Sequence, residues 1–294
     1  MTTLLDLLKS KIPKSKLQFA PRSFDLIGSM AIVEIKDEVK KYEKQIANAI
    51  MQLHKPIRTV VKKSSAMKGE YRVRRVKIIA GGKSTETIYR EHNVAMRFDV
   101  AKTYFSVRLS HERERVAALV KNKENVLVMF AGVGPFALVI AKKHPKANVI
   151  GIEKNPAAAK YFEENIKLNK LQNCKAIRGD VRKVIAIGSW PLASGQKLKA
   201  NSQRLISWAD RILMPLPKSA ENFLDVAFKA AKNNCVIHFY NFGADENVFE
   251  QVREKINKAA KKCNVKIKIL NEKIVRPYAP HIVQVCIDFK VNKN

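Results

Sequence analysis

The fold is decided by the stretch Val126-Leu-Val-Met-Phe-Ala-Gly-Val-Gly-Pro-Phe136. Its first part is an apolar run typical of a buried strand, and a helical pattern begins at Pro135. Gly132 and Gly134 lie at the turn, where glycine lets the backbone approach a ligand and the helix N-terminus offers free N–H groups. Glu153 follows at the end of a second apolar run. Because a carboxylate at that place accepts hydrogen bonds from ribose hydroxyls, the pattern predicts a βαβ unit that binds a nucleoside.

Length and composition indicate a soluble chain. Its 294 residues suit one large or two modest domains, and 46% hydrophobic with 28% charged residues is typical of a globular protein. No apolar stretch reaches transmembrane length, and the N-terminal segment has the pattern of a short amphipathic helix, without the layout of a signal peptide. We therefore expect a cytoplasmic protein with no membrane partner.

The net charge of +30 is the strongest global signal, and both halves of the chain are basic. Such a charge favours a polyanion as partner, with phosphate contacts dominating the affinity. The alternative is the lysine-rich composition of hyperthermophiles, but that bias raises glutamate together with lysine. Here 56 basic residues stand against 26 acidic ones, so we expect a nucleic acid.

Cysteine and histidine spacing gives no sign of a metal. The four cysteines have no CxxC spacing, and the six histidines form no HxxxH or HExxH pair. We interpret the cysteines as reduced core residues and predict that the protein holds no metal.

The chain divides into three parts by pattern. Residues 1–16 are expected to form a short helix and a link rich in lysine and proline, and residues 17–105 a small α+β domain with a hairpin at Gly81-Gly82-Lys83. Within residues 106–294, strands and helices alternate, which implies a parallel sheet. Residues 185–208 interrupt the alternation and are interpreted as an excursion or a binding loop.

The glycine motif alone does not select the cofactor. It fits G-x-G-x-x-A, so NAD remains an alternative. Three features favour S-adenosylmethionine: Asn155-Pro156 starts a helix directly after Glu153, Asp180 ends the third strand where adenine would lie, and an antiparallel pair closes the sheet. Asp180 taken alone is also an ordinary helix N-cap.

Several segments together resemble one family, the tRNA (guanine-37-N1)-methyltransferases of archaea and eukaryotes. The segments are Gly69-Glu-Tyr-Arg72, Tyr104-Phe-Ser106, His111-Glu-Arg113, Phe130-Ala-Gly-Val-Gly-Pro-Phe136, Glu153-Lys-Asn-Pro156, Asn165-Ile-Lys-Leu-Asn169, Gly179-Asp180, Met214-Pro-Leu-Pro-Lys218 and Arg276-Pro-Tyr-Ala-Pro280. The resemblance spans about residues 20–290. It implies a class I, Rossmann-like α/β methyltransferase domain with a smaller N-terminal α+β domain that takes part in RNA recognition.

The resemblance also implies the ligands. The cofactor is S-adenosylmethionine, and the partner is tRNA, recognised at position 37 of its anticodon stem-loop, with tRNA-Phe among the substrates. The protein itself is expected to be a monomer. The expected cofactor-binding residues are Phe130, Gly132, Gly134, Phe136, Glu153, Lys154, Asn155, Asp180, Val181 and Met214.

Methylating guanine at N1 requires a base for the N1 proton and a donor to O6. The resemblance places the base at Glu112 and the donor at Arg72, and Arg113 is expected to hold Glu112 or to contact a phosphate. Without the resemblance, the favoured interpretation of the charges around Glu112 is a solvated helix face with salt bridges. Arg72 shares a strand face with Arg74, so phosphate binding is an alternative for it.

Pro215 departs from the family pattern. The motif after the fourth strand is commonly Asn-Leu-Pro, and here it is Pro215-Leu216-Pro217. Proline has neither a side-chain acceptor nor an N–H, so one hydrogen bond to the base edge is lost, at a cost of about 1–3 kcal/mol. We expect the pocket to admit a bulkier, less polar ring. Pro215 fits the archaeal branch that also methylates C7 of 4-demethylwyosine, the wyosine precursor.

Val128 is a second departure, since many relatives carry Asp there; cofactor binding is expected to survive. Two other functions are alternatives. One is a wyosine-pathway aminocarboxypropyl transferase, which usually lacks the Pro-Leu-Pro motif. The other is a catalytically idle RNA-binding protein, against which Glu112 and Arg72 argue. A flipped base would need a stacking partner, although each aromatic candidate is also an ordinary core residue. These candidates are Tyr71, Tyr104, Phe105 and Tyr278.

Overall fold

The computed structural model describes residues 2–65, 69, 71, 73–187, 205–216 and 218–293. Arg72, Pro217 and most of the predicted connection at 185–208 lie outside the described residues. The chain forms two compact units, Met1–Glu91 with Ala95–Val107 and His92–Val94 with Arg108–Asn294.

The N-terminal unit is built on a four-stranded sheet of order β1-β2-β3-β4 and a two-stranded sheet of β5 and β6. In the larger sheet, β2 and β3 are parallel, whereas the other neighbours are antiparallel. The elements are α1 (Leu4–Leu8), η1 (Lys14–Phe19), β1 (Phe24–Ile27), β2 (Met30–Val33), η2 (Asp37–Tyr42), α2 (Glu43–Leu53), β3 (Thr59–Lys63), β4 (Val76–Gly81), β5 (Glu86–Glu91) and β6 (Val94–Asp99).

The first residues are part of this unit and not a link. Thr3 and Asp6 form a capping box that starts α1. Leu4, Leu8 and Ile12 are buried in the same core as α2. The lysine and proline content of this segment predicted a link, but its leucines supply a buried face.

The predicted hairpin at Gly81-Gly82-Lys83 is wrong, because β4 pairs with β3 and β5 pairs with β6. Gly81 has a φ of 86°, and a Cβ there would lie 2.0 Å from the carbonyl oxygen of Arg58. Glycine is therefore required for close passage beside β3. The tight turn is at His92 and Asn93, which have consecutive positive φ angles of 44° and 62°, as in a type I′ hairpin.

The C-terminal unit contains a seven-stranded sheet of order β12-β13-β11-β10-β7-β8-β9. Strands β11, β10, β7, β8 and β9 are parallel to one another. Strand β13 lies between β11 and β12 and is antiparallel to both. The elements are η3 (Val107–Leu109), α3 (Ser110–Leu119), β7 (Asn125–Met129), α4 (Pro135–Lys143), β8 (Asn148–Glu153), α5 (Pro156–Leu168), β9 (Cys174–Arg178), α6 (Val181–Ile187), β10 (Ala209–Met214), η4 (Ala220–Phe223), α7 (Leu224–Ala230), β11 (Ala231–Ala244), α8 (Val248–Lys262), β12 (Lys266–Ala279) and β13 (Ile282–Asn292).

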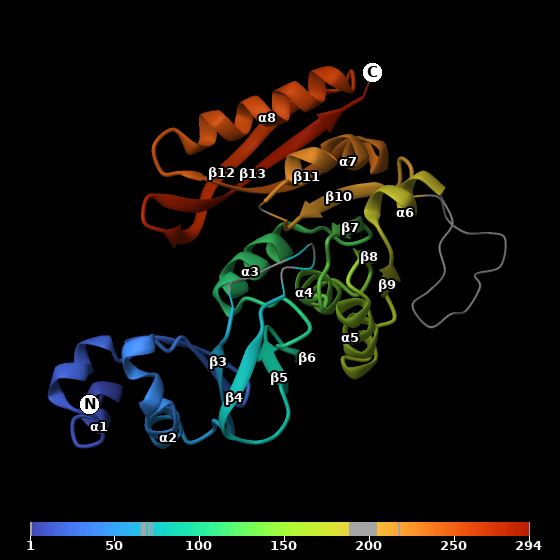
Figure 1. Cartoon of the computed structure of the whole chain (residues 1–294). Helices are drawn as coiled ribbons and strands as arrows, with labels where there is room; N and C mark the ends of the chain where they lie inside the picture. The colour runs from blue at the N-terminus through green and yellow to red at the C-terminus, as the bar shows by residue number, and fades with distance from the viewer. Residues whose placement is uncertain are drawn as a thin grey trace. The chain divides into compact units, whose positions relative to one another are not determined.

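This arrangement confirms the predicted parallel sheet with its closing antiparallel pair. Helices α7 and α8 cover one face of the sheet, and α3, α4 and α5 cover the other (Figure 1). The strand order reverses at β7, between β10 and β8. In such sheets the ligand binds outside the carboxyl ends of the strands at the reversal point. In the described part of the chain, no helix has the length and apolarity needed to cross a membrane.

Candidate active site

The glycine turn after β7 has a left-handed backbone. Phe130, Gly132 and Gly134 have φ angles of 60°, 59° and 92°. Positive φ is rare for a bulky residue such as Phe130 and is typical of functional turns. A Cβ on Gly134 would lie 2.1 Å from the ring of Phe162 on α5, so this position admits only glycine.

Two residues of α5 hold the turn, and neither was given a role from the sequence. Asn165 is fully buried, and its Nδ2 donates to the carbonyl of Val133 at 3.1 Å. The ring of Phe162 packs against Gly134 and also fills the space beside Gly151 of β8. The motif Asn165-Ile-Lys-Leu-Asn169 was a sequence signal for Asn165. Phe162 could be found only from its place on the apolar face of α5.

Glu153 connects the end of β8 to the glycine turn. Its Oε2 accepts from the backbone N–H of Gly132 and its Oε1 from that of Asn155, both at 2.7 Å. Burial raises the pKa of Glu153, whereas its backbone hydrogen bonds act in the opposite direction. Each carboxylate oxygen keeps lone-pair capacity for a further donor. The side chain therefore fits the two hydroxyls of a ribose, as S-adenosylmethionine requires.

Asp180 caps a helix and forms an ion pair. Its Oδ1 accepts from the N–H of Arg182 at 2.9 Å, and its Oδ2 lies 2.9 Å from Nζ of Lys154. Burial acts to raise the pKa of Asp180, but the hydrogen bond from Lys154 contributes to a net lowering. The N-cap alternative is thus present in the structure. Contact with adenine stays a prediction.

The other expected cofactor residues are mostly buried. Phe136, Val181 and Met214 are no more than 4% exposed. Met214 ends β10, and its carbonyl accepts from the N–H of Leu216 at 2.8 Å, closing a tight turn around the half-buried Pro215. Contacts of Met214 with a cofactor would therefore come from its backbone.

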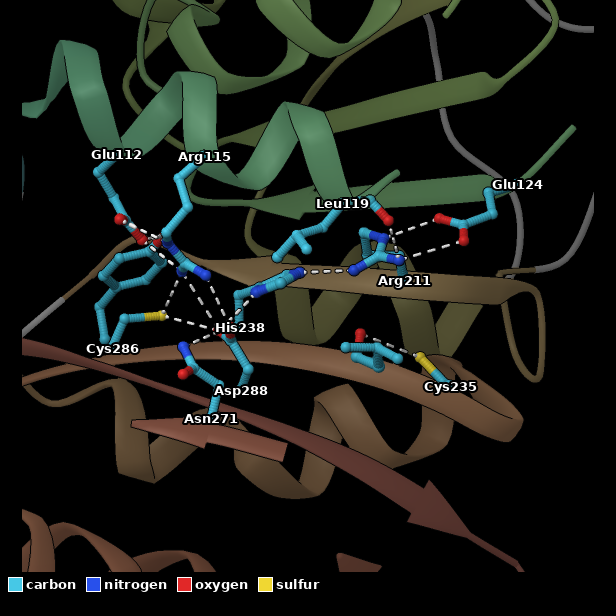
Figure 2. Close-up of polar contacts among 12 residues, drawn as sticks. Glu112, Arg115, Leu119, Glu124, Arg211, Cys235, His238, Asn271, Cys286 and Asp288 are labelled. Atoms are coloured by element: carbon cyan, nitrogen blue, oxygen red, sulfur yellow. Dashed lines mark hydrogen bonds and ion pairs between the residues drawn. The ribbon is translucent and has the colours of Figure 1, made fainter. Parts of the chain in front are cut away.

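Glu112 lies on α3 and is only 3% exposed. Its Oε1 accepts from the hydroxyl of Tyr240 at 2.8 Å and from Nη2 of Arg115 at 2.7 Å, and its Oε2 accepts from Nε of Arg115 at 2.8 Å (Figure 2). The interpretation of these charges as a solvated helix face is wrong for Glu112 and for Arg113, because Arg113 is also buried, at 1% exposed. Arg115 is a guanidinium that holds Glu112, a role the sequence interpretation considered for Arg113.

The contacts of Arg115 continue into a buried polar network. Its Nη1 donates to Asp288 Oδ2 at 2.7 Å, and Nδ1 of His238 lies 2.6 Å from Asp288 Oδ1 (Figure 2). Nε2 of His238 lies 2.8 Å from Nη1 of Arg211, whose Nε donates to Glu124 at 2.7 Å. Because a guanidinium can only donate, Nε2 of His238 accepts, and the imidazole proton is on Nδ1, directed at Asp288.

The network sets the charge states of its members. Burial lowers the pKa of His238, so the imidazole stays neutral. Although burial alone would raise the pKa of Asp288, its hydrogen bonds with His238 and Arg115 hold that pKa well below its usual range. The network comprises Glu112, Arg115, Glu124, Arg211, His238, Tyr240 and Asp288.

Among the described residues, His238, Cys286 and Asp288 are a group whose potential metal-ligand atoms lie within 4.8 Å of one another. The free lone pair of His238 is taken by Arg211, and both oxygens of Asp288 are engaged by protein donors. Burial raises the pKa of the Cys286 thiol, which disfavours the thiolate that would bind a metal or attack a base. The group is therefore a hydrogen-bonded cluster in which Asp288 accepts from His238 and Cys286.

The N-terminal unit has a cavity of about 60 Å³ with an aromatic lining. Nε of Arg74 is buried at this cavity and has no hydrogen-bond partner among the described residues. Phe105 packs on Phe98 at 4.6 Å and on Tyr89 at 5.2 Å between ring centroids, and both Tyr104 and Phe105 line the cavity.

The sheet order, the glycine turn and Glu153 define a class I methyltransferase that uses S-adenosylmethionine. Comparison with known families narrows the class. The TRM5/TYW2 methyltransferase domain matches residues 87–268, and the TYW2 N-terminal domain matches residues 4–85. The chain belongs to the TRM5/TYW2 methyltransferase family, which confirms the predicted family, fold and cofactor.

Two relatives indicate the range of this family. The chain is 42% identical over 281 residues to the tRNA (guanine(37)-N(1))-methyltransferase Trm5b of Pyrococcus abyssi, covering 96% of this chain and 78% of the relative. It is 33% identical over 294 residues to the tRNA (guanine(37)-N(1))/4-demethylwyosine(37)-methyltransferase Taw22 of Nanoarchaeum equitans, covering 87% and 97%.

Two solved structures are similar throughout. The complex of aTrm5 with tRNALeu has a TM-score of 0.79 at 32% identity, over 99% of this chain and 78% of that one. P. horikoshii TYW2 in complex with MeSAdo has a TM-score of 0.80 at 28% identity, over 99% and 98%.

Replacing Glu153 with alanine is expected to weaken S-adenosylmethionine binding by roughly 10- to 150-fold, because hydrogen bonds to a charged group contribute about 1.5–3 kcal/mol. Calorimetry measures the effect. Glu164→Ala is the matched control, since this residue lies on α5 in an exposed i,i+4 pair with Lys160 and should leave the affinity unchanged.

The wild type is expected to bind S-adenosylmethionine although Val128, which is buried in β7, stands where many relatives carry Asp. Absence of wild-type binding at millimolar cofactor would contradict this expectation.

Proposed function

We propose that this protein transfers a methyl group from S-adenosylmethionine to N1 of guanosine 37 in tRNA, and also to C7 of 4-demethylwyosine at position 37 of tRNA-Phe. The names of the Trm5b and Taw22 relatives support both activities. The net charge of +30 supports a tRNA partner. Such an enzyme would act in the cytoplasm as a monomer.

The observation that carries the proposal is the geometry around Glu112. This carboxylate is 3% exposed, and its Oε1 accepts from the hydroxyl of Tyr240 and from Nη2 of Arg115. Its Oε2 accepts from Nε of Arg115, which also donates to Asp288. A carboxylate held in one orientation by fixed donors is the arrangement that a general base requires.

S-adenosylmethionine supplies an electrophilic methyl group when it is bound. Glu153 and the glycine turn would hold its ribose, and Asp180 its adenine. Glu112 would take the N1 proton of the guanine, while the methyl carbon would exchange its bond to the cofactor's sulfur for a bond to N1. Tyr240 and Arg115 fix the direction of that carboxylate. Arg72, which the structure does not describe, is the proposed donor to O6. Arg113 is proposed to assist Glu112 and not to contact a phosphate, because it is 1% exposed.

The second substrate is proposed from Pro215. This half-buried proline stands at the carboxyl end of β10 and offers neither a side-chain acceptor nor an N–H. A guanine loses one specific contact there, and a tricyclic base meets an apolar surface. The name of the Taw22 relative includes both guanine and 4-demethylwyosine at position 37, which supports this assignment.

One observation favours a second candidate. Residues 4–85 match the TYW2 N-terminal domain, and the chain is 32% identical to a relative from Methanocaldococcus jannaschii named tRNA(Phe) (4-demethylwyosine(37)-C(7)) aminocarboxypropyltransferase. Both similarities are consistent with transfer of the cofactor's aminocarboxypropyl chain. The motif Met214-Pro-Leu-Pro217 after β10 argues against this candidate, because the aminocarboxypropyl transferases usually lack Pro-Leu-Pro there.

Mass spectrometry of tRNA-Phe after incubation with the cofactor separates these functions. We expect a single methyl increment on position 37 of unmodified tRNA-Phe and another on tRNA carrying the tricyclic base. The matched control is the same tRNA incubated without cofactor. A larger, aminocarboxypropyl increment would establish the second candidate, and no product on the tricyclic substrate would remove the dual specificity.

A further inference from the structure

The end of the β12–β13 hairpin carries an exposed aromatic ring. Tyr278 is 43% exposed, although it lies in a strand of the main sheet. The register of β12 on β13 shifts between Pro277 and Ala279, so Tyr278 lies in an irregularity of this pairing. Irregularities of this kind re-aim side chains next to functional sites.

The strand register puts this ring on the same sheet face as Glu112. Tyr240 pairs with Cys286, and Phe242 pairs with Gln284, without a shift. Side chains two residues apart share a face, so Phe242 lies on the face where Tyr240 meets Glu112. At strand geometry the Cα atoms of residues 240 and 242 are roughly 7 Å apart.

Three side chains on this face form one assembly, which we name the hairpin platform: Phe242, Arg276 and Tyr278. The ring centroids of Phe242 and Tyr278 are 4.2 Å apart, with an interplanar angle of 37°. The guanidinium of Arg276 lies 5.5 Å from the centroid of Tyr278, and its Nε donates to Oε1 of Gln284 at 2.9 Å. Gln284 is 2% exposed, so a buried residue fixes the guanidinium beside the exposed ring.

The chemistry of the platform matches single-stranded RNA. Every base has a π-face, and stacking on an aromatic ring beside a guanidinium is how sequence-tolerant sites hold unpaired nucleotides. Residues 273–282 contain Lys273 and Arg276 but no acidic residue, so the segment would attract phosphate. The net charge of the chain has the same sign.

We propose that the hairpin platform stacks the base of a nucleotide that flanks the methylated one. The inference rests on the proposed function, since it assigns the platform to the RNA that brings its target base to Glu112. A target base that leaves its stack exposes the π-faces of its neighbours. The platform would cover one of them and so hold the loop open.

Anisotropy of a labelled anticodon stem-loop tests this with S-adenosylhomocysteine present, so that no chemistry is needed. Tyr278→Ala is expected to weaken RNA binding by roughly 5- to 150-fold. Tyr278→Phe should bind as the wild type, and Tyr278→Leu, which keeps bulk without a ring, should behave as alanine. The matched control is Ile274→Ala. Ile274 is 49% exposed on the same strand but pairs with Val285 on the opposite face, and its loss should leave binding unchanged.

A second measurement localises the contact. 2-Aminopurine placed on either side of position 37 should be quenched by the wild type at one position and not by Tyr278→Leu. Unchanged RNA affinity in Tyr278→Leu, or an equal loss in Ile274→Ala, would overturn the proposal. Neither readout depends on methyl transfer. If the wild type bound the stem-loop without methylating it, the proposed function would fail separately.

Discussion

Replacing Glu112 with glutamine is expected to lower kcat for methylation of guanosine 37 by roughly 10²- to 10⁴-fold, the range of a general base. Glutamine keeps the shape of the side chain and an oxygen for Tyr240, but its amide does not accept the N1 proton at neutral pH. Its amide nitrogen would also face Nε of Arg115, which donates to Glu112 in the wild type. Single-turnover methyl transfer at saturating tRNA and cofactor measures the loss.

The control for this variant is Glu114→Gln on the same helix. The side chain of Glu114 is 58% exposed, and its contact with His92 is a long 3.9 Å, so the activity should be unchanged. Calorimetry should show the same affinity for S-adenosylmethionine in both variants and the wild type. Full activity of Glu112→Gln would leave Glu112 as a structural member of the buried network and would require another base.

Tyr240→Phe tests whether Tyr240 orients the carboxylate of Glu112, because this variant leaves Glu112 itself unchanged. The variant removes one hydrogen bond to Glu112 and keeps the ring, which packs on Phe136 with centroids 5.9 Å apart. A shifted pH–rate profile with a smaller loss in kcat than Glu112→Gln is the expected pattern. It would identify Tyr240 as a positioning residue.

The parts of the site that the sequence predicted are local. The glycine turn, Glu153 and Asp180 each end an apolar run, so the periodicity of the chain places them at one edge of a parallel sheet. The same reasoning failed at Gly81, where the glycine serves a close approach to Arg58 and not a hairpin. A glycine signal reports an unusual backbone but not which neighbour causes it.

The network around Glu112 was missed because its members are distant in sequence. Arg115 and Asp288 are 173 positions apart, and Tyr240 and Glu112 are 128 apart. One signal was available. His238 and Asp288 are polar residues inside apolar strand runs, and such residues need partners when they are buried. Pattern alone did not show that the two pair in register on β11 and β13.

Replacing Asp288 with alanine is expected to destabilise the fold by about 3–5 kcal/mol, because breaking this buried ion pair leaves donors of Arg115 and His238 without an acceptor. Asp288 is 3% exposed, and its loss removes a partner of both Arg115 and His238. Urea denaturation at neutral pH measures the difference. The matched control is Asp225→Ala, whose pair with Arg182 is exposed on both sides and should contribute no more than about 1 kcal/mol. Equal effects of the two substitutions would show that the buried network does not support the fold.

The pH dependence of stability follows from the same pairs. The pKa of His238 is below its ordinary 6.5 in the folded state, so as pH falls below 6.5 the unfolded chain takes up a proton that the folded chain refuses. Wild-type stability should therefore decrease on acidification from that pH.

The pKa of Asp288 is held below its ordinary 3.8, so the contribution of Asp288 to the stability of the fold is complete above that value and is lost only in stronger acid. The gap between wild type and Asp288→Ala should consequently persist from pH 7 to pH 5 and narrow below about pH 4. A gap that closed already near pH 6 would contradict an ionised Asp288, because a carboxyl with so low a pKa keeps its charge throughout that interval.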